Sequence, residues 1–218
     1  MDKKTVFSHI DHTLLKPEAQ WKDIDRVCKE AVDNCMASAC IPPRFVKLAK
    51  EKYGNRLVLC TVIGFPLGYS TTRVKVFETQ QAVLEGADEI DMVIHIGDAK
   101  AGDFDQVTEE IRAVKAACNG KILKVIVETC YLNEEEKVAV CTCVSDAGAD
   151  FIKTSTGFGS AGAAPEDIEL FKQHIAPDVK IKAAGGIRTR EAIEGYLHQG
   201  CERVGASSAL KAYENEAY

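Results

Sequence analysis

Eight short apolar segments alternate with amphipathic segments along the whole chain, and this alternation constrains the fold more than any other feature. The apolar segments have the length of β-strands and are predicted as strands at residues 6–11, 37–41, 56–63, 89–95, 122–128, 151–154, 180–184 and 203–206. The segments between them have helical periodicity and are predicted as α-helices at residues 21–34, 43–53, 72–85, 103–118, 133–147, 165–175 and 188–198, with a short helix after Ser208.

Alternating strands and helices predict an α/β fold with a parallel sheet, because parallel strands are joined by long right-handed crossovers. Eight such units are what a (β/α)8 TIM barrel needs. An open, doubly wound sheet is the alternative, but no Gly-x-Gly-x-x-Gly motif follows the first predicted strand. No linker or low-complexity segment divides the chain, so residues 1–218 are expected to form a single domain.

The bulk composition excludes several classes of function. A net charge of −6 gives no broad attraction to nucleic acid or to an anionic membrane, and no stretch is apolar for long enough to span a bilayer. The nine cysteines are scattered without a Cys-x-x-Cys pair, so neither a zinc site nor a redox motif is expected. Most lie among aliphatic residues, which is typical of free thiols, and a reducing, cytoplasmic location is predicted.

The sixth predicted strand carries a lysine, Lys153, in its middle. Side chains alternate along a strand, so Phe151, Lys153 and Ser155 share one face. Burying an ammonium group is unfavourable, and a desolvated lysine loses its proton readily and attacks carbonyl groups. The alternative is a lysine at the mouth of the strand with its ammonium group in water.

Two charged residues on other predicted strands favour the chemical role. Lys182 lies on the next strand and, like Lys153, just precedes a glycine turn, so the two amines are expected at similar heights. Two ammonium groups that close disfavour double protonation, although one of them could instead point outward. Asp91 lies between apolar residues of the fourth strand and is predicted to face the interior, where a lysine would be its partner.

Other polar residues near strand ends have weaker signals. Lys124 and Glu128 share one face of the fifth strand and are predicted to form an internal ion pair rather than to catalyse. His12 follows the first strand and could be a base, but a hydrogen-bonding role is more usual for such a histidine.

Glycine turns follow the seventh and eighth strands, where TIM barrels commonly bind phosphate. Gly185 and Gly186 follow the seventh strand, and Gly205 lies beside Ser207 and Ser208 at the eighth. Glycines let the backbone approach a ligand closely, and free N–H groups at the next helix start can bind an anion. The sequence therefore predicts a phosphate site at these two turns.

The motifs that carry these residues occur in one order across nearly the whole chain, and the chain resembles the 2-deoxyribose-5-phosphate aldolases, a family of class I aldolases. The matching segments are residues 10–16 (IDHTLLK), 86–93 (GADEIDMV), 123–129 (LKVIVET), 148–157 (GADFIKTSTG), 182–189 (KAAGGIRT) and 205–208 (GASS).

The resemblance implies a role for each matching residue. Lys153 resembles the lysine that forms the Schiff base, Lys182 the neighbouring cation that favours its neutral amine, and Asp91 the carboxylate of the proton relay. The phosphate and substrate positions are Asp11, Cys40, Thr154, Gly157, Gly185, Gly186, Gly205, Ser207 and Ser208. A terminal tyrosine shuttles protons in some members, and Tyr218 could do so if the tail folds back. Some members carry a lysine near the phosphate where this chain has Phe158.

The resemblance implies reversible cleavage of 2-deoxy-D-ribose 5-phosphate to D-glyceraldehyde 3-phosphate and acetaldehyde, with these small molecules as the only partners and no cofactor. Three alternatives stay open. They are another Schiff-base aldolase, a phosphosugar epimerase or isomerase that uses acid–base chemistry alone, and a non-catalytic sugar-phosphate sensor. The sequence also leaves open whether the chain forms a homodimer.

Overall fold

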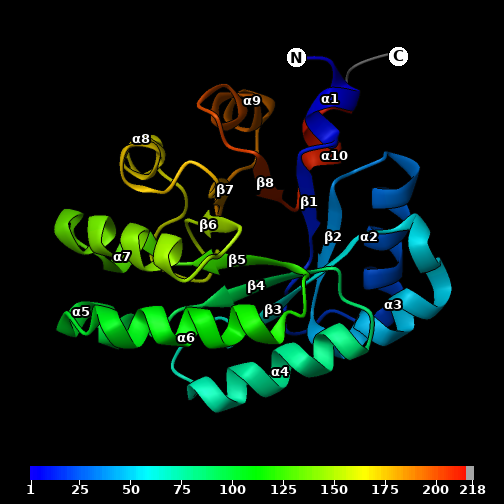
Figure 1. The fold of residues 1–218 in the computed structure, drawn as a ribbon. Coiled ribbons are helices and arrows are strands. Elements are labelled where there is room, and N and C mark those ends of the chain that lie inside the picture. Colours follow the sequence, from blue (N-terminus) through cyan, green and yellow to red (C-terminus); the bar gives the residue numbers. More distant parts are fainter. Residues whose placement is uncertain (215–218) are drawn as a thin grey trace.

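The computed structural model describes residues 1–214 and contains a closed barrel of eight parallel strands with helices around it (Figure 1). Each strand pairs with the next along the chain, and β8 pairs with β1, so the (β/α)8 prediction is confirmed and the open sheet is excluded. The strands are β1 (Ile10–Thr13), β2 (Ser38–Ile41), β3 (Leu59–Ile63), β4 (Glu89–Val93), β5 (Ile122–Ile126), β6 (Phe151–Lys153), β7 (Lys180–Ala184) and β8 (Arg203–Ala206).

The helices include all those predicted, with small shifts at their ends, and two that were not predicted, at residues 3–7 and 96–101. They are α1 (Lys3–Phe7), α2 (Trp21–Asp33), α3 (Val46–Tyr53), α4 (Thr72–Leu84), α5 (Ile96–Ala101), α6 (Phe104–Ala117), α7 (Glu134–Asp146), α8 (Pro165–His174), α9 (Arg190–His198) and α10 (Ala209–Ala212), with the 3-10 turns η1 (Pro43–Phe45), η2 (Gly54–Arg56) and η3 (Thr129–Tyr131). No helix within residues 1–214 is long and apolar enough to cross a lipid bilayer.

Local capping explains where several helices begin. The Asn133 side chain accepts a hydrogen bond from the backbone N–H of Glu136 at 2.9 Å, and the Glu136 side chain accepts one from the Asn133 N–H, so α7 starts with a capping box. Thr189 caps α9 by accepting from the backbone N–H of Ala192 at 3.2 Å. The helices predicted at residues 133–147 and 188–198 therefore begin at, or one residue before, these caps.

The N-terminal strand was predicted too early. Residues 6–11 were expected to be extended, but the chain is helical over α1 and β1 begins only at Ile10. Asp2 caps α1 by accepting from the backbone N–H of Thr5 at 3.0 Å. Val6 and Phe7 are buried on the inner face of this short helix, and the Phe7 ring packs edge-on against Tyr213. The apolar pattern that predicts a strand here therefore belongs to the buried face of a helix.

The barrel has two different faces. Residues that point outward, such as Ile90, Val125 and Ile152, belong to the apolar core between strands and helices. Residues that alternate with them point inward, and on β4 to β7 these include Asp91, Lys124, Lys153 and Lys182. The alternation that places aliphatic side chains against the helices therefore also concentrates charged side chains inside the barrel.

Candidate active site

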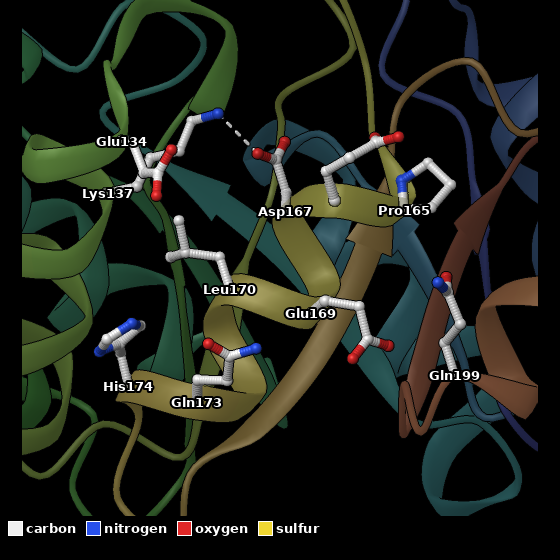
Figure 2. A pocket seen from close by; sticks show the side chains of 10 residues that line it. Glu134, Lys137, Pro165, Asp167, Glu169, Leu170, Gln173, His174 and Gln199 are labelled. Carbon is white, nitrogen blue, oxygen red and sulfur yellow. Dashed lines mark hydrogen bonds and ion pairs between the residues drawn. The ribbon is translucent and has the colours of Figure 1, made fainter.

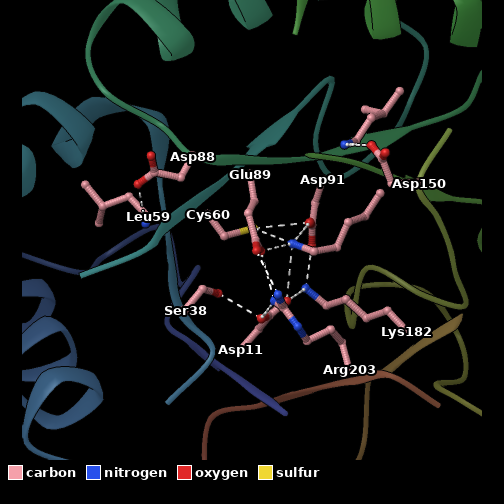
Figure 3. A network of polar contacts seen from close by, with 12 residues as sticks. Asp11, Ser38, Leu59, Cys60, Asp88, Glu89, Asp91, Asp150, Lys182 and Arg203 are labelled. Atoms are coloured by element: carbon pink, nitrogen blue, oxygen red, sulfur yellow. Dashed lines mark hydrogen bonds and ion pairs between the residues drawn. The ribbon is translucent and has the colours of Figure 1, made fainter. Parts of the chain in front are cut away.

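Charged side chains from six strands meet inside the barrel. Figure 3 shows part of this cluster: Asp91 and Glu89 of β4 face Asp11, Lys182 and Arg203 across the interior. The four cations are Lys124, Lys153, Lys182 and Arg203, and the three carboxylates are Asp11, Glu89 and Asp91.

Asp91 is the centre of this cluster. The Nζ atoms of Lys153 and Lys182 each lie 2.7 Å from its Oδ2 atom, and Nζ of Lys124 lies 2.9 Å from its Oδ1 atom. Lys153 and Lys182 are also register partners on β6 and β7. The predictions that Asp91 faces the interior and that the two lysines lie at one height are therefore confirmed, and neither lysine points outward.

The other two carboxylates hold the remaining cations. Asp11 accepts hydrogen bonds from Lys182 and, at 2.7 Å, from Nη1 of Arg203. Glu89 binds Nζ of Lys124 at 2.6 Å and Nη2 of Arg203 at 2.8 Å. Lys124, Lys182 and Arg203 thus each contact at least two carboxylates, whereas Lys153 contacts only one, Asp91, and shares its oxygen with Lys182.

These contacts decide which groups are ionised. Burial alone would raise the pKa values of Asp11 and Asp91, but the surrounding cations hold both well below the usual range of a carboxyl group. Burial would likewise lower the pKa values of Lys124 and Lys182, but the carboxylates outweigh it and raise both above the usual lysine value. Asp11 and Glu89 raise the pKa of Arg203 against the same burial penalty.

The number of charges singles out Lys153. Three protonated side chains, Lys124, Lys182 and Arg203, balance three carboxylates inside a medium that solvates charge poorly. Lys153 is the fourth basic side chain of the cluster, and it shares its carboxylate oxygen with Lys182. The two lysines are therefore as close as expected, and Lys182 is the one whose pKa the carboxylates raise.

A cavity of about 350 Å³ opens above Lys153 at the carboxyl ends of the strands. Loops after β1, β6, β7 and β8 form its wall, and Lys153 is the only residue of the charged cluster among those that line it. Of the predicted phosphate positions, the cavity is lined by Gly157, Gly185, Gly186, Gly205 and Ser207. The cavity therefore joins the Lys153 amine to the two glycine turns.

Close backbone approach explains two of these glycines. Gly185 has φ of +88°, and a Cβ atom there would lie 3.0 Å from Cα of Gly162. A Cβ atom on Gly205 would lie 3.1 Å from Cβ of Ala184 and 3.3 Å from Cε of Lys182. The turn after β7 thus needs glycine for its conformation, and Gly205 leaves room for the Lys182 side chain.

The remaining predicted positions lie elsewhere. The Thr154 hydroxyl bonds to the backbone of Ala184 and is buried outside the cavity lining, and Cys40 is buried beside Cys60 inside the barrel. Ser208 lies on a neighbouring surface hollow with Arg188. Tyr218 lies outside the described residues.

Two cations at the cavity were missed from the sequence. Lys16, after β1, and Arg188, after β7, both line the cavity and are exposed. Neither side chain has an ionic partner among residues 1–214. They lie in motifs that were recognised, but no periodicity in a loop tells which way a side chain points. They provide the local positive charge that an acidic chain needs to bind an anion.

The predicted Lys124–Glu128 ion pair is wrong. Lys124 binds the carboxylates of β4, and Glu128 instead holds the loop after β6. Its Oε1 atom accepts from the backbone N–H of Thr156 at 3.0 Å, and its Oε2 atom accepts from the Thr156 hydroxyl. The Glu128 backbone has φ of 53° and ψ of 64°, a left-handed conformation that is uncommon for residues other than glycine. The strand therefore ends before Glu128, and the parity argument does not apply to it.

His12 is also accounted for. It lies on β1 and faces away from the lysines, because its Nε2 atom is 2.8 Å from Oε2 of Glu30 on α2. It has the hydrogen-bonding role that was favoured, and it does not line the cavity.

Two groups of side chains inside the barrel have donor atoms close enough to coordinate a metal ion. They are Cys40 with Cys60 and Asp91, and Asp11 with Cys60 and Glu89. The carboxylates of both groups already bind lysine or arginine, so a divalent cation would have to displace ammonium or guanidinium groups from a positively charged cluster. The residues present do not suit a metal, and metal independence stays a prediction.

A second hollow, of about 550 Å³, lies on the outer surface between α7 and α8 (Figure 2). It contains an ion pair of 2.6 Å between Nζ of Lys137 and Oδ1 of Asp167. None of the predicted site residues lines this hollow, and it lies between helices, not at the carboxyl ends of the strands. The cavity above Lys153 is therefore the candidate active site.

Fold and site together define a class of protein: a (β/α)8 barrel with a buried lysine at the base of a cavity that opens at the carboxyl ends of the strands. A model of the DeoC/LacD family of aldolases matches residues 3–214, and the chain belongs to this family. The chain is 54% identical to a deoxyribose-phosphate aldolase of Clostridium botulinum and 51% identical to one of Clostridioides difficile; the alignments cover 100% of both chains in the first case, and 98% of this chain and 97% of the relative in the second.

Solved structures agree with this assignment. A putative deoxyribose-phosphate aldolase from Coccidioides immitis superimposes with a TM-score of 0.94 at 37% identity, covering 98% of this chain and 86% of that one. The deoxyribose phosphate aldolase from Aeropyrum pernix, which is described as tetrameric, has a TM-score of 0.91 at 31% identity and covers 98% and 91%.

Proposed function

We propose that the chain is a single-domain class I aldolase that cleaves 2-deoxy-D-ribose 5-phosphate reversibly to D-glyceraldehyde 3-phosphate and acetaldehyde. The observation that carries the proposal is the position of Lys153, which lines the cavity and lies 2.7 Å from Asp91 as the fourth basic side chain of a cluster with three carboxylates. The names of the relatives support the choice of substrate. The nine unpaired cysteines support a cytoplasmic location.

Lys153 begins the reaction as a nucleophile. Its Nζ lone pair forms a bond to C1 of the open-chain aldehyde, and the carbonyl oxygen gains two protons and leaves as water, which gives an iminium ion. The C3 hydroxyl loses its proton, the C2–C3 bonding pair moves into the C1–C2 bond, and C3 becomes the aldehyde of glyceraldehyde 3-phosphate. Carbon counting places the broken bond between C2 and C3, not between C3 and C4, because the two-carbon product retains C1.

Asp91 and Lys182 serve the proton transfers that follow. The enamine takes a proton at C2, and water then hydrolyses the iminium to release acetaldehyde and the free amine. Oδ2 of Asp91 lies 2.7 Å from the Lys153 amine and the same distance from the Lys182 amine, so it can pass a proton between these two groups. Because its pKa is low, Asp91 carries a proton only briefly.

Product analysis tests this function against the alternatives. The purified protein should release acetaldehyde and glyceraldehyde 3-phosphate in equal amounts from 2-deoxy-D-ribose 5-phosphate, without added metal. An epimerase or isomerase would give a five-carbon product and no acetaldehyde. Another Schiff-base aldolase would prefer a ketone over acetaldehyde as the donor in the reverse reaction. Binding of the sugar phosphate without formation of any product would indicate a non-catalytic sugar-phosphate sensor.

Lys16 and Arg188 should set the preference for a phosphorylated substrate. Replacing Arg188 by Gln should lower kcat/KM for the phosphorylated sugar by about 10- to 100-fold, because a charge-assisted bond to phosphate contributes about 1.5–3 kcal/mol. The rate with unphosphorylated 2-deoxyribose should change little. Arg56→Gln is the matched control, since Arg56 lies before β3, at the other end of the barrel. An equal loss with both sugars would place the phosphate elsewhere.

Glu128 should position the loop that closes the phosphate side of the cavity. Glu128→Ala removes both acceptors for Thr156, so KM for the phosphorylated sugar should rise by about tenfold or more, while kcat changes less. Glu128→Gln retains one acceptor oxygen and should have an intermediate KM. Steady-state kinetics of the two variants will show this order. A fall in kcat at constant KM would assign Glu128 to the chemical step instead.

A further inference from the structure

Cys60 of β3 lies inside the barrel, in direct contact with the charged cluster. Its side chain is fully buried, and its sulfur atom lies 3.1 Å from Oδ1 of Asp91 (Figure 3). Nζ of Lys124 lies 3.2 Å from the same sulfur atom and 2.9 Å from the same carboxylate oxygen. The three side chains therefore form a closed triangle on one side of the Asp91 carboxylate.

The Cys60 thiol keeps its proton, so it can donate to this carboxylate. Burial, together with the negative charge of Asp91, raises its pKa well above the usual value of a thiol. Two other acceptors are near, the carbonyl oxygen of Thr61 at 3.9 Å and the sulfur atom of Cys40 within 4.8 Å. The carboxylate is closer than the carbonyl oxygen and, unlike both alternatives, it is charged, so it is the stronger acceptor.

The same sulfur atom also accepts a hydrogen bond. The Lys124 ammonium group donates to it, so the side chain at this position must donate to an anion and accept from a cation. A thiol or a hydroxyl group can do both, and an aliphatic side chain can do neither. Val62 and Phe65 belong to the same small apolar group of side chains as Cys60, so packing alone would suit an aliphatic residue here.

The two oxygens of Asp91 have different partners. Oδ2 lies 2.7 Å from the Nζ atoms of Lys153 and Lys182. Oδ1 is bound by Lys124 and Cys60. In the proposed reaction the Lys153 nitrogen becomes part of an iminium ion, so the partner of Oδ2 changes from step to step. The partners of Oδ1 form no bond to the substrate, and they can hold the carboxylate while Oδ2 exchanges its hydrogen bonds.

We propose that Cys60 is a positioning residue of the aldolase reaction, whose thiol holds Oδ1 of Asp91 so that Oδ2 stays directed at Lys153. This inference rests on the proposed function, in which Asp91 transfers protons beside the imine. A carboxylate turns readily about its last side-chain torsion, because torsions between sp³ and sp² atoms have broad minima. A neutral donor limits this rotation without adding a further charge to the cluster, whereas another lysine or arginine would add one.

Loss of the thiol should slow the proton transfers and spare formation of the imine. The amine that attacks the aldehyde belongs to Lys153, which lines the cavity, whereas Cys60 is not among the residues of the lining. Exchange of the acetaldehyde methyl protons with solvent requires repeated proton transfer at C2, and NMR measures it directly. Because S–H is a weak donor, the exchange rate should fall by about 3- to 10-fold.

Two substitutions separate hydrogen bonding from packing. Cys60→Val fills the space but neither donates nor accepts, so it should show the full loss of exchange and an equal loss of kcat, with little change in KM. Cys60→Ser keeps a donor and an acceptor on a slightly shorter bond, so its exchange rate should recover toward that of the unmodified protein. A purely structural role predicts the opposite order, because valine suits apolar surroundings better than serine does.

Borohydride trapping and a matched variant complete the test. Both Cys60 variants should still acquire the reduced two-carbon adduct on Lys153 to the same extent as the unmodified protein. Cys28→Ser is the control, since Cys28 is also fully buried but lies on α2 in the apolar core. It should lower the melting temperature and leave the exchange rate unchanged. Cys60→Ala repeats the test without added bulk, and it should exchange as slowly as Cys60→Val.

Four outcomes would overturn the role of Cys60. In the first, Cys60→Val and Cys60→Ala exchange protons as fast as the unmodified protein. In the second, Cys60→Ser is as slow as Cys60→Val, which would show that packing decides. In the third, the adduct on Lys153 declines in parallel with exchange, so that Cys60 acts on the nucleophile. In the fourth, the unmodified protein forms no adduct and exchanges no protons, which would overturn the proposed function as well.

Discussion

Lys153→Ala should lose turnover by at least about 10⁴-fold, because the variant has no amine with which to form the imine. Borohydride added to the unmodified protein with acetaldehyde should reduce that imine and leave one ethyl group on Lys153, which peptide mass spectrometry locates. The variant should acquire no such group. The reason is structural: among the four cations of the cluster inside the barrel, Lys153 alone both lines the cavity and contacts a single carboxylate of the described residues.

Lys153→Arg is the matched control for this experiment. The guanidinium group retains a positive charge beside Asp91 but does not form an imine, so the barrel should keep its stability while activity stays lost. An ethyl group found on Lys124 or Lys182 would move the nucleophile but keep the aldolase mechanism. Turnover without an adduct on any lysine would exclude the Schiff base altogether.

The sequence predicted the parts of the molecule that repeat or alternate. Eight strand–helix units predict the closed barrel, because each unit has a length and apolar pattern that can be read locally. Alternation along a strand predicts which side chains point inward, and it correctly places Asp91, Lys153 and Lys182 together. The same parity could have revealed Glu89, two residues before Asp91, and Arg203, two residues before Gly205.

Residues outside regular strands could not be placed in this way. Glu128 follows β5 in a left-handed conformation, so its side chain leaves the face that it would occupy on a strand. Lys16 and Arg188 lie on loops whose course depends on the neighbouring loops of the barrel. The Val6–Phe7 pair is buried either as strand or as helix, and only the Asp2 cap decides between them.

The proton state of the cluster also depends on three-dimensional contacts. From the sequence, two neighbouring lysines predict that one amine is neutral but do not say which. The structure adds two contacts that the sequence did not predict. Asp11 and Asp91 both bind Lys182, and Arg203 is a further cation of the cluster, bound to Asp11. With these in place, Lys182 is the cation that stays protonated, and its charge acts on Lys153 through the shared oxygen of Asp91.

Lys182→Leu should therefore move the rising limb of the pH–activity profile to higher pH and reduce activity at pH 7 by at least about 100-fold. Without Lys182, the cluster holds Lys124, Lys153 and Arg203 against three carboxylates, so a protonated Lys153 now balances the charge. The direction of the shift follows directly: removing a neighbouring positive charge favours the protonated form of the Lys153 amine, so a higher pH is needed to generate the nucleophile. At a few ångström, one such charge is worth about 3 kcal/mol at an effective dielectric constant of about 20.

Lys182→Arg separates this electrostatic effect from proton transfer. Arginine restores the charge, so the profile should return toward that of the unmodified protein, although its group does not release a proton. Asp11 retains Arg203 and Lys124, and Asp91 retains Lys124 and Lys153, so both variants should fold; thermal unfolding will verify this. If Lys182→Leu lowers activity equally at every pH, Lys182 acts as a proton donor, and the charge balance of the cluster does not control Lys153.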